Sequence, residues 1–208
     1  MGIREERRAE RRNAVLNAAM DLIEKEGVHG VTIAAVAKEI GASVGGMYRY
    51  FPNKRAIFVA LQLRSIGYFR DFMLTQLKAV EGQQALLRVR TAFEAWPRFQ
   101  EEAPQHYGLL DEFLSLPERT LDDQQAAAVQ VELLVLMKEI AALIEAAAQA
   151  GALREGDAMA RAHLLWAALH GLQHFRKRDP VQPESLRTAS LQEQLFETFF
   201  RAWGWQSP

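Results

Sequence analysis

Apolar residues recur at helical spacing along most of the chain, and almost no segment alternates with the period of two that a strand requires. In residues 6–26, Val15, Leu22 and Ile23 fall on one stripe that ends before Gly27. Similar segments predict further helices over residues 54–80, 83–96, 104–117, 120–150, 157–177 and 185–205. With two short helices over residues 32–51, the chain is predicted to be all-α with about nine helices.

Several helix ends carry residues that favour those positions. Asn53 and Asp157 stand where helices are expected to begin, and Thr120 with Asp123 forms a capping-box-like start of the longest late helix. Pro97 is expected to kink or end its helix, because proline lacks a backbone N–H.

Residues 32–51 predict two short helices joined by a tight turn. Thr32 is placed as the N-cap of the first helix, whose buried face includes Val36. Gly41 stands where this helix must stop, because a residue without Cβ adopts the left-handed conformation at low cost. Ser43 then caps the second helix.

The second short helix, from Val44 to about Phe51, contains two glycines that each cost roughly 1 kcal/mol relative to alanine. A helix that presses against another backbone benefits from missing side chains, and local rules tend to break at functional sites. We therefore expect this helix to lie in a DNA groove. Residues predicted to contact DNA, through donors, flat rings and exposed amides, are Thr32, Ser43, Val44, Gly45, Gly46, Tyr48, Arg49, Tyr50 and Lys54.

This segment resembles the DNA-binding motif of TetR-family transcriptional regulators. The positions in register with the family pattern are Thr32, Val36, Ala37, Gly41, Ala42, Ser43, Gly45, Tyr48, Tyr50, Phe51 and Lys54. The resemblance covers about residues 9–69, with mild departures that include Ile40 and Arg55. It implies a three-helix DNA-binding helix-turn-helix domain over residues 1–53 and a helical ligand-binding and dimerisation domain over residues 54–208.

Composition agrees with a regulator that acts inside the cell. A chain of 208 residues with 49% hydrophobic content can bury a sizeable core in one or two domains. No run of 18 apolar residues and no signal-peptide pattern occurs, so we expect a cytoplasmic protein with no membrane partner. The absence of cysteine excludes disulfides, zinc–cysteine sites and a thiol nucleophile.

The formal net charge of -1 is unusual for a DNA-binding protein, but positive charge is concentrated at the N-terminus. A flexible basic arm there would be able to follow DNA phosphates; its residues are Arg4, Arg7, Arg8, Arg11 and Arg12. The alternative is a solvated helix start in which Glu5, Glu6 and Glu10 balance the arginines. The sequence favours neither interpretation.

The last two predicted helices each carry apolar residues on two sides. In residues 157–177 one side holds Ala160, Leu164, Ala168 and Phe175, and another holds Leu165, Leu169 and Leu172. In residues 185–205 the two stripes are Leu191, Leu195 and Phe199, and Phe196, Phe200 and Trp203. Because one monomer covers only one side of each helix, we expect a two-fold homodimer through a four-helix interface that includes Leu191, Leu195 and Phe199. The family resemblance implies the same assembly, and a wholly intramolecular core is the alternative.

Aromatic and histidine residues gather in the second half of the chain. His163, Trp166, His170 and His174 fall within a sector of roughly 80° on one helix. The resemblance implies a ligand cavity in this region, and we expect an aromatic pocket for a small, fairly apolar organic effector. Its predicted lining is Phe69, Phe72, Trp96, Phe99, Tyr107, Phe113, Met137, Trp166, His170 and His174.

Other interpretations of these residues stay open. Aromatic residues at helical spacing are often plain core, and His170 with His174 has the spacing of a metal pair, although the sequence places no carboxylate beside them. No cofactor or metal site is therefore predicted. The histidines could also act as general bases, but no hydrolase, zinc-protease, P-loop or dinucleotide motif is present, so an enzyme is not expected.

The pattern and the resemblance together predict a homodimeric repressor that binds a palindromic double-stranded operator and leaves it when an effector binds. A transcriptional activator, or a helical interaction protein on the same fold, is the alternative.

Overall fold

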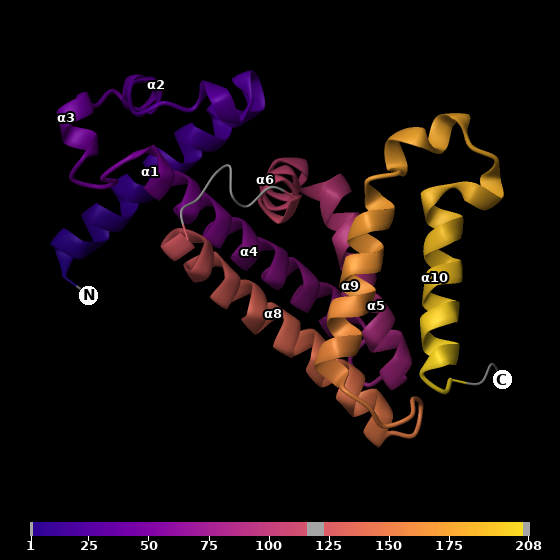
Figure 1. Ribbon diagram of the computed structural model, residues 1–208. Coiled ribbons are helices and arrows are strands. Elements are labelled where there is room, and N and C mark those ends of the chain that lie inside the picture. Colours follow the sequence, from indigo (N-terminus) through magenta and orange to yellow (C-terminus); the bar gives the residue numbers. More distant parts are fainter. Residues whose placement is uncertain (1, 116–122, 206–208) are drawn as a thin grey trace. The chain divides into compact units, whose positions relative to one another are not determined.

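The computed structural model describes residues 2–115 and 123–205, with side chains described for residues 2–112 and 127–205, and in this part of the chain every regular element is a helix. The all-α prediction is confirmed. The α-helices are α1 (Ile3–Glu26), α2 (Ile33–Glu39), α3 (Val44–Met47), α4 (Lys54–Ala79), α5 (Ala85–Glu102), α6 (Pro104–Ser115), α8 (Asp123–Gln149), α9 (Ala158–Gln173) and α10 (Thr188–Ala202) (Figure 1). Short 3₁₀ helices are η1 (Val28–Gly30), η2 (Arg176–Val181) and η3 (Glu184–Leu186). None of the described helices is long and apolar enough to cross a membrane.

The chain forms two compact units. The first comprises residues 1–68 and 103–132, and the second comprises residues 69–102 and 133–208. The boundary between them falls within α4, which is one continuous helix.

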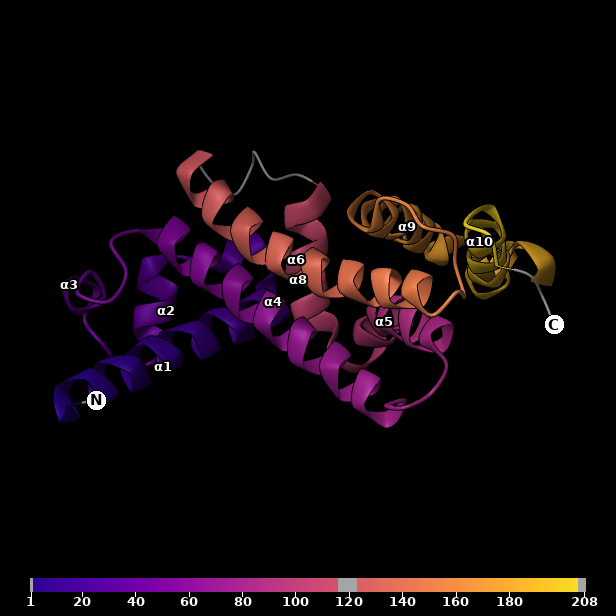
Figure 2. The same cartoon turned by 90° about the horizontal axis from the view of Figure 1, so that it is seen from below.

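In the first unit α1 packs against α2 and α6, and α2 packs against α3. Its core is built from fully buried side chains of α1 to α4, which include Val15, Val36, Met47, Phe51 and Ile57. In the second unit α9 contacts both α5 and α10. Figures 1 and 2 show α9 and α10 side by side, joined by the segment that holds η2 and η3.

Local sequence signals account for several helix ends. The side chains of Asn53 and Asp157 accept hydrogen bonds from Ala56 N at 2.8 Å and Ala160 N at 2.9 Å, as predicted for N-caps. The capping-box prediction for Thr120 and Asp123 lies outside the described residues and side chains, although α8 does begin at Asp123.

The expected effect of Pro97 is wrong in one respect. We expected this proline to kink or end its helix, and the predicted end is wrong because α5 continues through Pro97 to Glu102. Trp96 and Phe99, on either side of the proline, are at most 1% exposed. Burial of such side chains offsets the cost of roughly 3 kcal/mol that a proline imposes inside a helix.

The segment after α9 also differs from the sequence prediction. The helix was expected to reach about Lys177, but α9 ends at Gln173 and the chain continues as η2. The Asp179 side chain accepts hydrogen bonds from both the backbone N and the Oγ1 of Thr188, each at 2.9 Å. This carboxylate caps the start of α10 from the preceding loop, so α10 begins at Thr188 rather than near Ser185.

Candidate nucleic-acid interface

The turn between α2 and α3 is fixed by its own residues. Thr32 Oγ1 accepts a hydrogen bond from Ala35 N at 3.0 Å, and Ser43 Oγ accepts one from Gly46 N at 3.1 Å. Gly41 takes the left-handed conformation with φ of 62°, as predicted. Residues of this segment itself therefore hold the two helices in place.

Helix α3 has one buried and one exposed side. Met47 is fully buried and anchors the helix to the core, whereas Val44 is 44% and Tyr48 is 55% exposed. The helix ends at Met47, earlier than predicted, and the chain continues as turns in which Tyr50 N donates to Met47 O at 2.9 Å. Val44 and Tyr48 are thus presented to solvent on a short, rigid support.

The two glycines of α3 have different surroundings. A Cβ on Gly46 would lie 3.1 Å from Ser43 Oγ, so the cap itself favours glycine there. A Cβ on Gly45 would meet nothing within 4 Å. The interior of the chain does not require glycine at position 45, and the interpretation that it allows close approach to another backbone stays a prediction.

The N-terminal arginines lie on a helix and not on a flexible arm, because α1 begins at Ile3. The expectation of an arm is wrong. One of these arginines also has a role that the sequence pattern did not indicate. Arg12 Nη1 donates to Tyr50 O at 2.6 Å, and its guanidinium carbon lies 4.2 Å from the centre of the Phe51 ring. No local signal relates residues 38 positions apart, so only the structure reveals this link between α1 and the end of the helix-turn-helix.

Lys54, predicted to contact phosphate, makes contacts within the first unit. Its Nζ donates to Val28 O at 3.4 Å and lies 5.3 Å from the centre of the Phe58 ring. The lysine is half-buried at the start of α4. A phosphate contact by this lysine stays a prediction.

Six residues of the predicted effector pocket form a continuous aromatic cluster in the second unit. Phe69 contacts three rings, with centroid distances of 5.1 Å to Trp96, 5.2 Å to Phe99 and 6.1 Å to Trp166. Trp96 and Trp166 lie 4.7 Å apart, and Phe72 lies 5.5 Å from Phe99. His170 extends the cluster at 6.0 Å from Trp96. Because Phe69, Trp96 and Phe99 are at most 1% exposed, these rings fill the space between one another.

The remaining predicted pocket residues are placed less centrally. His174 is exposed, with its ring 4.9 Å from that of His170, and Met137 is buried in the second unit. Tyr107 is buried in the first unit, so its relation to the cluster stays a prediction. The side chain of Phe113 lies outside the described side chains. His163 is exposed, and its Nδ1 bonds to Met159 O at 2.9 Å.

The two apolar sides of α9 differ in burial, except that Leu172, predicted on the side of Leu165 and Leu169, is only half-buried. Leu165 and Leu169 are at most 1% exposed and belong to the core of the unit. Leu164 and Phe175, on the other side, are 56% and 53% exposed. In α10 one stripe is likewise buried; its members are Phe196, Phe200 and Trp203.

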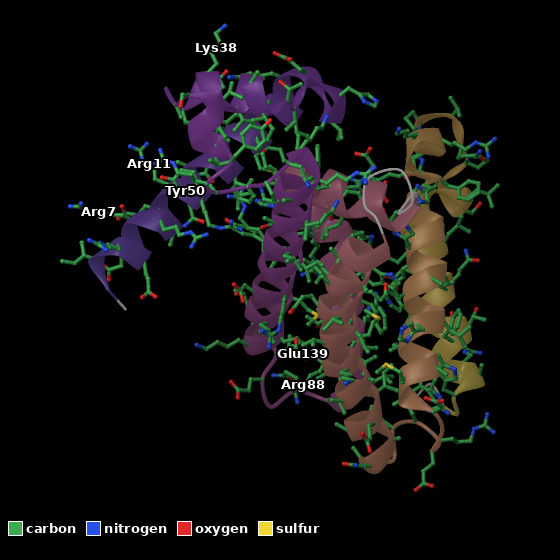
Figure 3. The ribbon with its side chains drawn as sticks, turned by 60° about the vertical axis from the view of Figure 1, so that its left-hand side comes forward. Arg7, Arg11, Lys38, Tyr50, Arg88 and Glu139 are labelled. Atoms are coloured by element: carbon green, nitrogen blue, oxygen red, sulfur yellow. The ribbon has the colours of Figure 1, made fainter. Side chains whose placement is uncertain are left out.

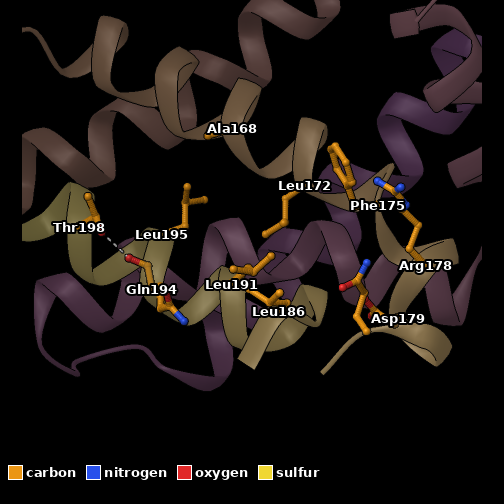
Figure 4. A pocket seen from close by; sticks show the side chains of 11 residues that line it. Ala168, Leu172, Phe175, Arg178, Asp179, Leu186, Leu191, Gln194, Leu195 and Thr198 are labelled. Carbon is orange, nitrogen blue, oxygen red and sulfur yellow. Dashed lines mark hydrogen bonds between the residues drawn. The ribbon is translucent and has the colours of Figure 1, made fainter. Parts of the chain in front are cut away.

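The exposed sides of α9 and α10 meet in an apolar groove of about 620 Å³ (Figure 4). Leu172 and Phe175 contribute from the α9 side, and Leu186, Leu191 and Leu195 contribute from η3 and α10. Phe199, the third residue predicted at the dimer interface, is half-buried like Leu191 and Leu195 but does not line the groove; it packs edge to face on Trp203 at 5.4 Å.

Comparison with known proteins agrees with this geometry. The sequence model of the family described as "Bacterial regulatory proteins, tetR family" matches residues 15–61, which include α2 and α3. The HTH-type transcriptional regulator RutR of Escherichia coli (strain K12) is 27% identical over 186 residues, covering 89% of this chain and 82% of RutR.

Solved structures show the same fold. The TetR-family transcriptional regulator PfmR from Thermus thermophilus superposes with a TM-score of 0.63 at 16% identity, covering 90% of this chain and 97% of PfmR. AibR in complex with isovaleryl coenzyme A and operator DNA gives a TM-score of 0.60 at 16% identity, covering 92% of this chain and 97% of AibR. The helix-turn-helix match, the relative that spans most of the chain and the shared all-helical fold together support a TetR-family transcriptional regulator, a class of DNA-binding proteins.

Proposed function

We propose that the protein is a homodimeric repressor that binds a palindromic operator through α3 and is released by a small organic effector. The observation that carries this proposal is the exposure of Val44 and Tyr48 on a helix whose turn and caps are already satisfied within the chain. Such a helix fits the major groove without rearrangement, and its exposed tyrosine supplies both a ring and a hydroxyl for base edges or phosphates.

The homodimer is supported by the groove on α9 and α10. Phe175 and Leu186, which line this groove, are more than half exposed, and covering them is favourable because it removes apolar area from water. A second copy presents the same two helices, so a two-fold axis beside the groove closes a four-helix interface. Two copies of α3 are then available for the two half-sites of a palindrome.

The effector site is proposed at the aromatic cluster around Trp96 and Trp166. The rings contact one another, so an effector binds there only by separating them. This separation couples effector binding to operator affinity. Helix α4 is one continuous helix whose start includes Lys54 and whose later turns carry Phe69 and Phe72. A ligand that prefers one arrangement of this helix shifts operator affinity by its differential binding, typically about 1 to 3 kcal/mol. AibR was solved in complex with both a coenzyme A ester and operator DNA, which supports a comparable pairing of ligand and DNA here.

The direct test is selection of bound duplexes from a randomised DNA pool, followed by affinity measurements on the enriched sequence. The proposal predicts an enriched inverted repeat and a loss of discrimination in Tyr48→Ala. Enrichment of no sequence would contradict operator binding and favour a helical interaction protein. A reporter placed behind the enriched site distinguishes a repressor, which lowers expression, from an activator, which raises it.

Release of the DNA by an effector at the aromatic cluster is tested separately. A screen of small aromatic compounds against the protein–duplex complex should find compounds that release the DNA. His170→Leu is expected to change the releasing concentration while leaving ligand-free affinity for the duplex within about threefold, since the histidine borders the cluster and is remote in sequence from α3. Equal release in the wild type and the variant would place the effector elsewhere.

A further inference from the structure

The N-terminal half of α1 and the end of the helix-turn-helix together enclose a hollow of about 410 Å³. Five of the six lining residues are arginines and the sixth is a tyrosine: Arg4, Arg7, Arg8, Arg11, Arg49 and Tyr50. Figure 3 shows Arg7 and Arg11 extending from α1, with Tyr50 close to Arg11. No carboxylate lines this hollow.

The arrangement of charge on α1 is directional. At 100° per residue, four arginines fall within a sector of about 100°, and three glutamates lie outside it. The arginines are Arg4, Arg7, Arg8 and Arg11, and the glutamates are Glu5, Glu6 and Glu10. Among the described residues, no ion pair or hydrogen bond engages the side chains of these four arginines. The structure thus has the helix start of the alternative interpretation, with its arginines and its glutamates on different sides of the helix.

This clustering is unfavourable for the isolated protein. Like charges three and four positions apart repel each other on a helix, and cations near a helix N-terminus also oppose the helix dipole. The hollow is nevertheless held in shape, because Arg12 binds Tyr50 O and stacks on Phe51. A preformed group of guanidiniums with no carboxylate in its lining is the chemistry that binds phosphate oxygens in two-pronged contacts.

We propose that this hollow binds the phosphodiester backbone of duplex DNA beside the groove that α3 occupies. Arg49 is the link between the two surfaces, since it lies two residues after the end of α3 and its side chain lines the hollow. Arg49 is thereby assigned to a phosphate and not to a base. The inference rests on the proposed operator binding, and it adds contacts that strengthen binding to every sequence alike.

The test is the salt dependence of DNA binding by the full chain. Arg7→Gln with Arg11→Gln removes two of the proposed phosphate contacts, and the slope of log affinity against log salt should become shallower by about two. Affinity at low salt should fall by a similar factor for the selected duplex and for a scrambled duplex. The matched control is Lys25→Gln with Lys138→Gln, which changes the net charge equally at exposed positions outside the hollow and should leave the slope unchanged.

A methylphosphonate scan of the selected duplex locates the contact. Neutralising the phosphate that meets the hollow should weaken the wild type and leave the double arginine variant unaffected. Unchanged slope in the arginine variant, or a loss confined to the selected sequence, would overturn the proposal. If the wild type shows no sequence preference yet the arginine variant still loses slope on the scrambled duplex, operator recognition fails while the backbone site stands.

Discussion

Two exposed surfaces in the described part of the chain are opposite in chemistry. The helix-turn-helix presents a tyrosine and a valine beside a hollow lined by arginines, with its core side chain Met47 fully buried. The face of α9 and α10 presents leucines and a phenylalanine around a groove. The first surface suits a polyanion, and the second suits the same apolar surface of a second copy of the chain. Exposure alone therefore identifies neither function, and the charge of each surface has to be considered as well.

The largest effect is expected at the α9–α10 face. Leu195→Glu should convert the dimer to monomers, because burying an unpaired carboxylate in an apolar interface costs several kcal/mol. Sedimentation velocity measures this directly, and operator binding should be lost with the dimer. Val131→Glu is the control, since Val131 is 59% exposed in α8 and outside the groove. A Leu195→Glu protein that still sediments as a dimer would remove this face from the interface.

The next largest effect is expected from replacing a buried aromatic residue of the cluster. Trp96→Ala should destabilise the protein by about 3 to 5 kcal/mol, because it leaves a cavity among Phe69, Phe99 and Trp166. Urea unfolding at a fixed protein concentration measures this loss. Added indole should raise the melting temperature of this variant only; a rise in the wild type would show that room for a ring already exists there.

The contrasting aromatic residue is Tyr48, which is 55% exposed at the end of α3. Tyr48→Ala should leave the free energy of unfolding within about 0.5 kcal/mol of the wild type. Its affinity for the selected duplex should fall by about 1 to 3 kcal/mol. Tyr68→Ala provides a tyrosine of nearly equal exposure, 56%, on α4, and it should retain full affinity in the same anisotropy titration. Equal losses in the two variants would mean that α3 is not the reading helix.

The smallest effect concerns His106, whose Nδ1 bonds to Ser65 Oγ at 2.9 Å and whose ring stacks on Tyr68. Burial, and then the charge of Arg64, lowers the pKa of this histidine below its usual value near 6.5. The unfolded chain therefore binds the proton more readily, and stability should fall slightly as pH drops through 6.5 toward the folded pKa. The urea concentration at the midpoint of unfolding should differ less between about pH 7.5 and about pH 5.5 in His106→Asn than in the wild type. An unchanged difference would show that His106 does not cause the pH dependence.

The sequence predicts local features better than distant ones. The caps at Thr32, Ser43 and Asn53 and the left-handed turn at Gly41 depend on residues within a few positions, and each is confirmed. The continuation of α5 through a proline and the cap that Asp179 gives to α10 depend on burial and on a loop contact, which no local pattern records.

The same limit applies to the candidate sites. Periodicity identified two apolar sides of α9, of which the side with Leu165 and Leu169 is buried, but it placed Leu172 on that side although Leu172 lines the groove. The family resemblance implied that aromatic residues of several helices line one cavity, but it did not reveal that their rings fill the space between them. The arginine hollow was missed for a related reason, since Arg49 joins the α1 arginines only when α3 and α1 are packed in one unit.

Operator binding as a homodimer requires that two copies of this chain bind one palindrome. Sedimentation of the protein with the selected full inverted repeat, and with a duplex that carries a single half-site, measures this stoichiometry. We expect two protomers on the full site and an affinity for the half-site that is weaker by at least about tenfold. One protomer per duplex, with equal affinity for both DNAs, would show that the chain binds DNA as a monomer.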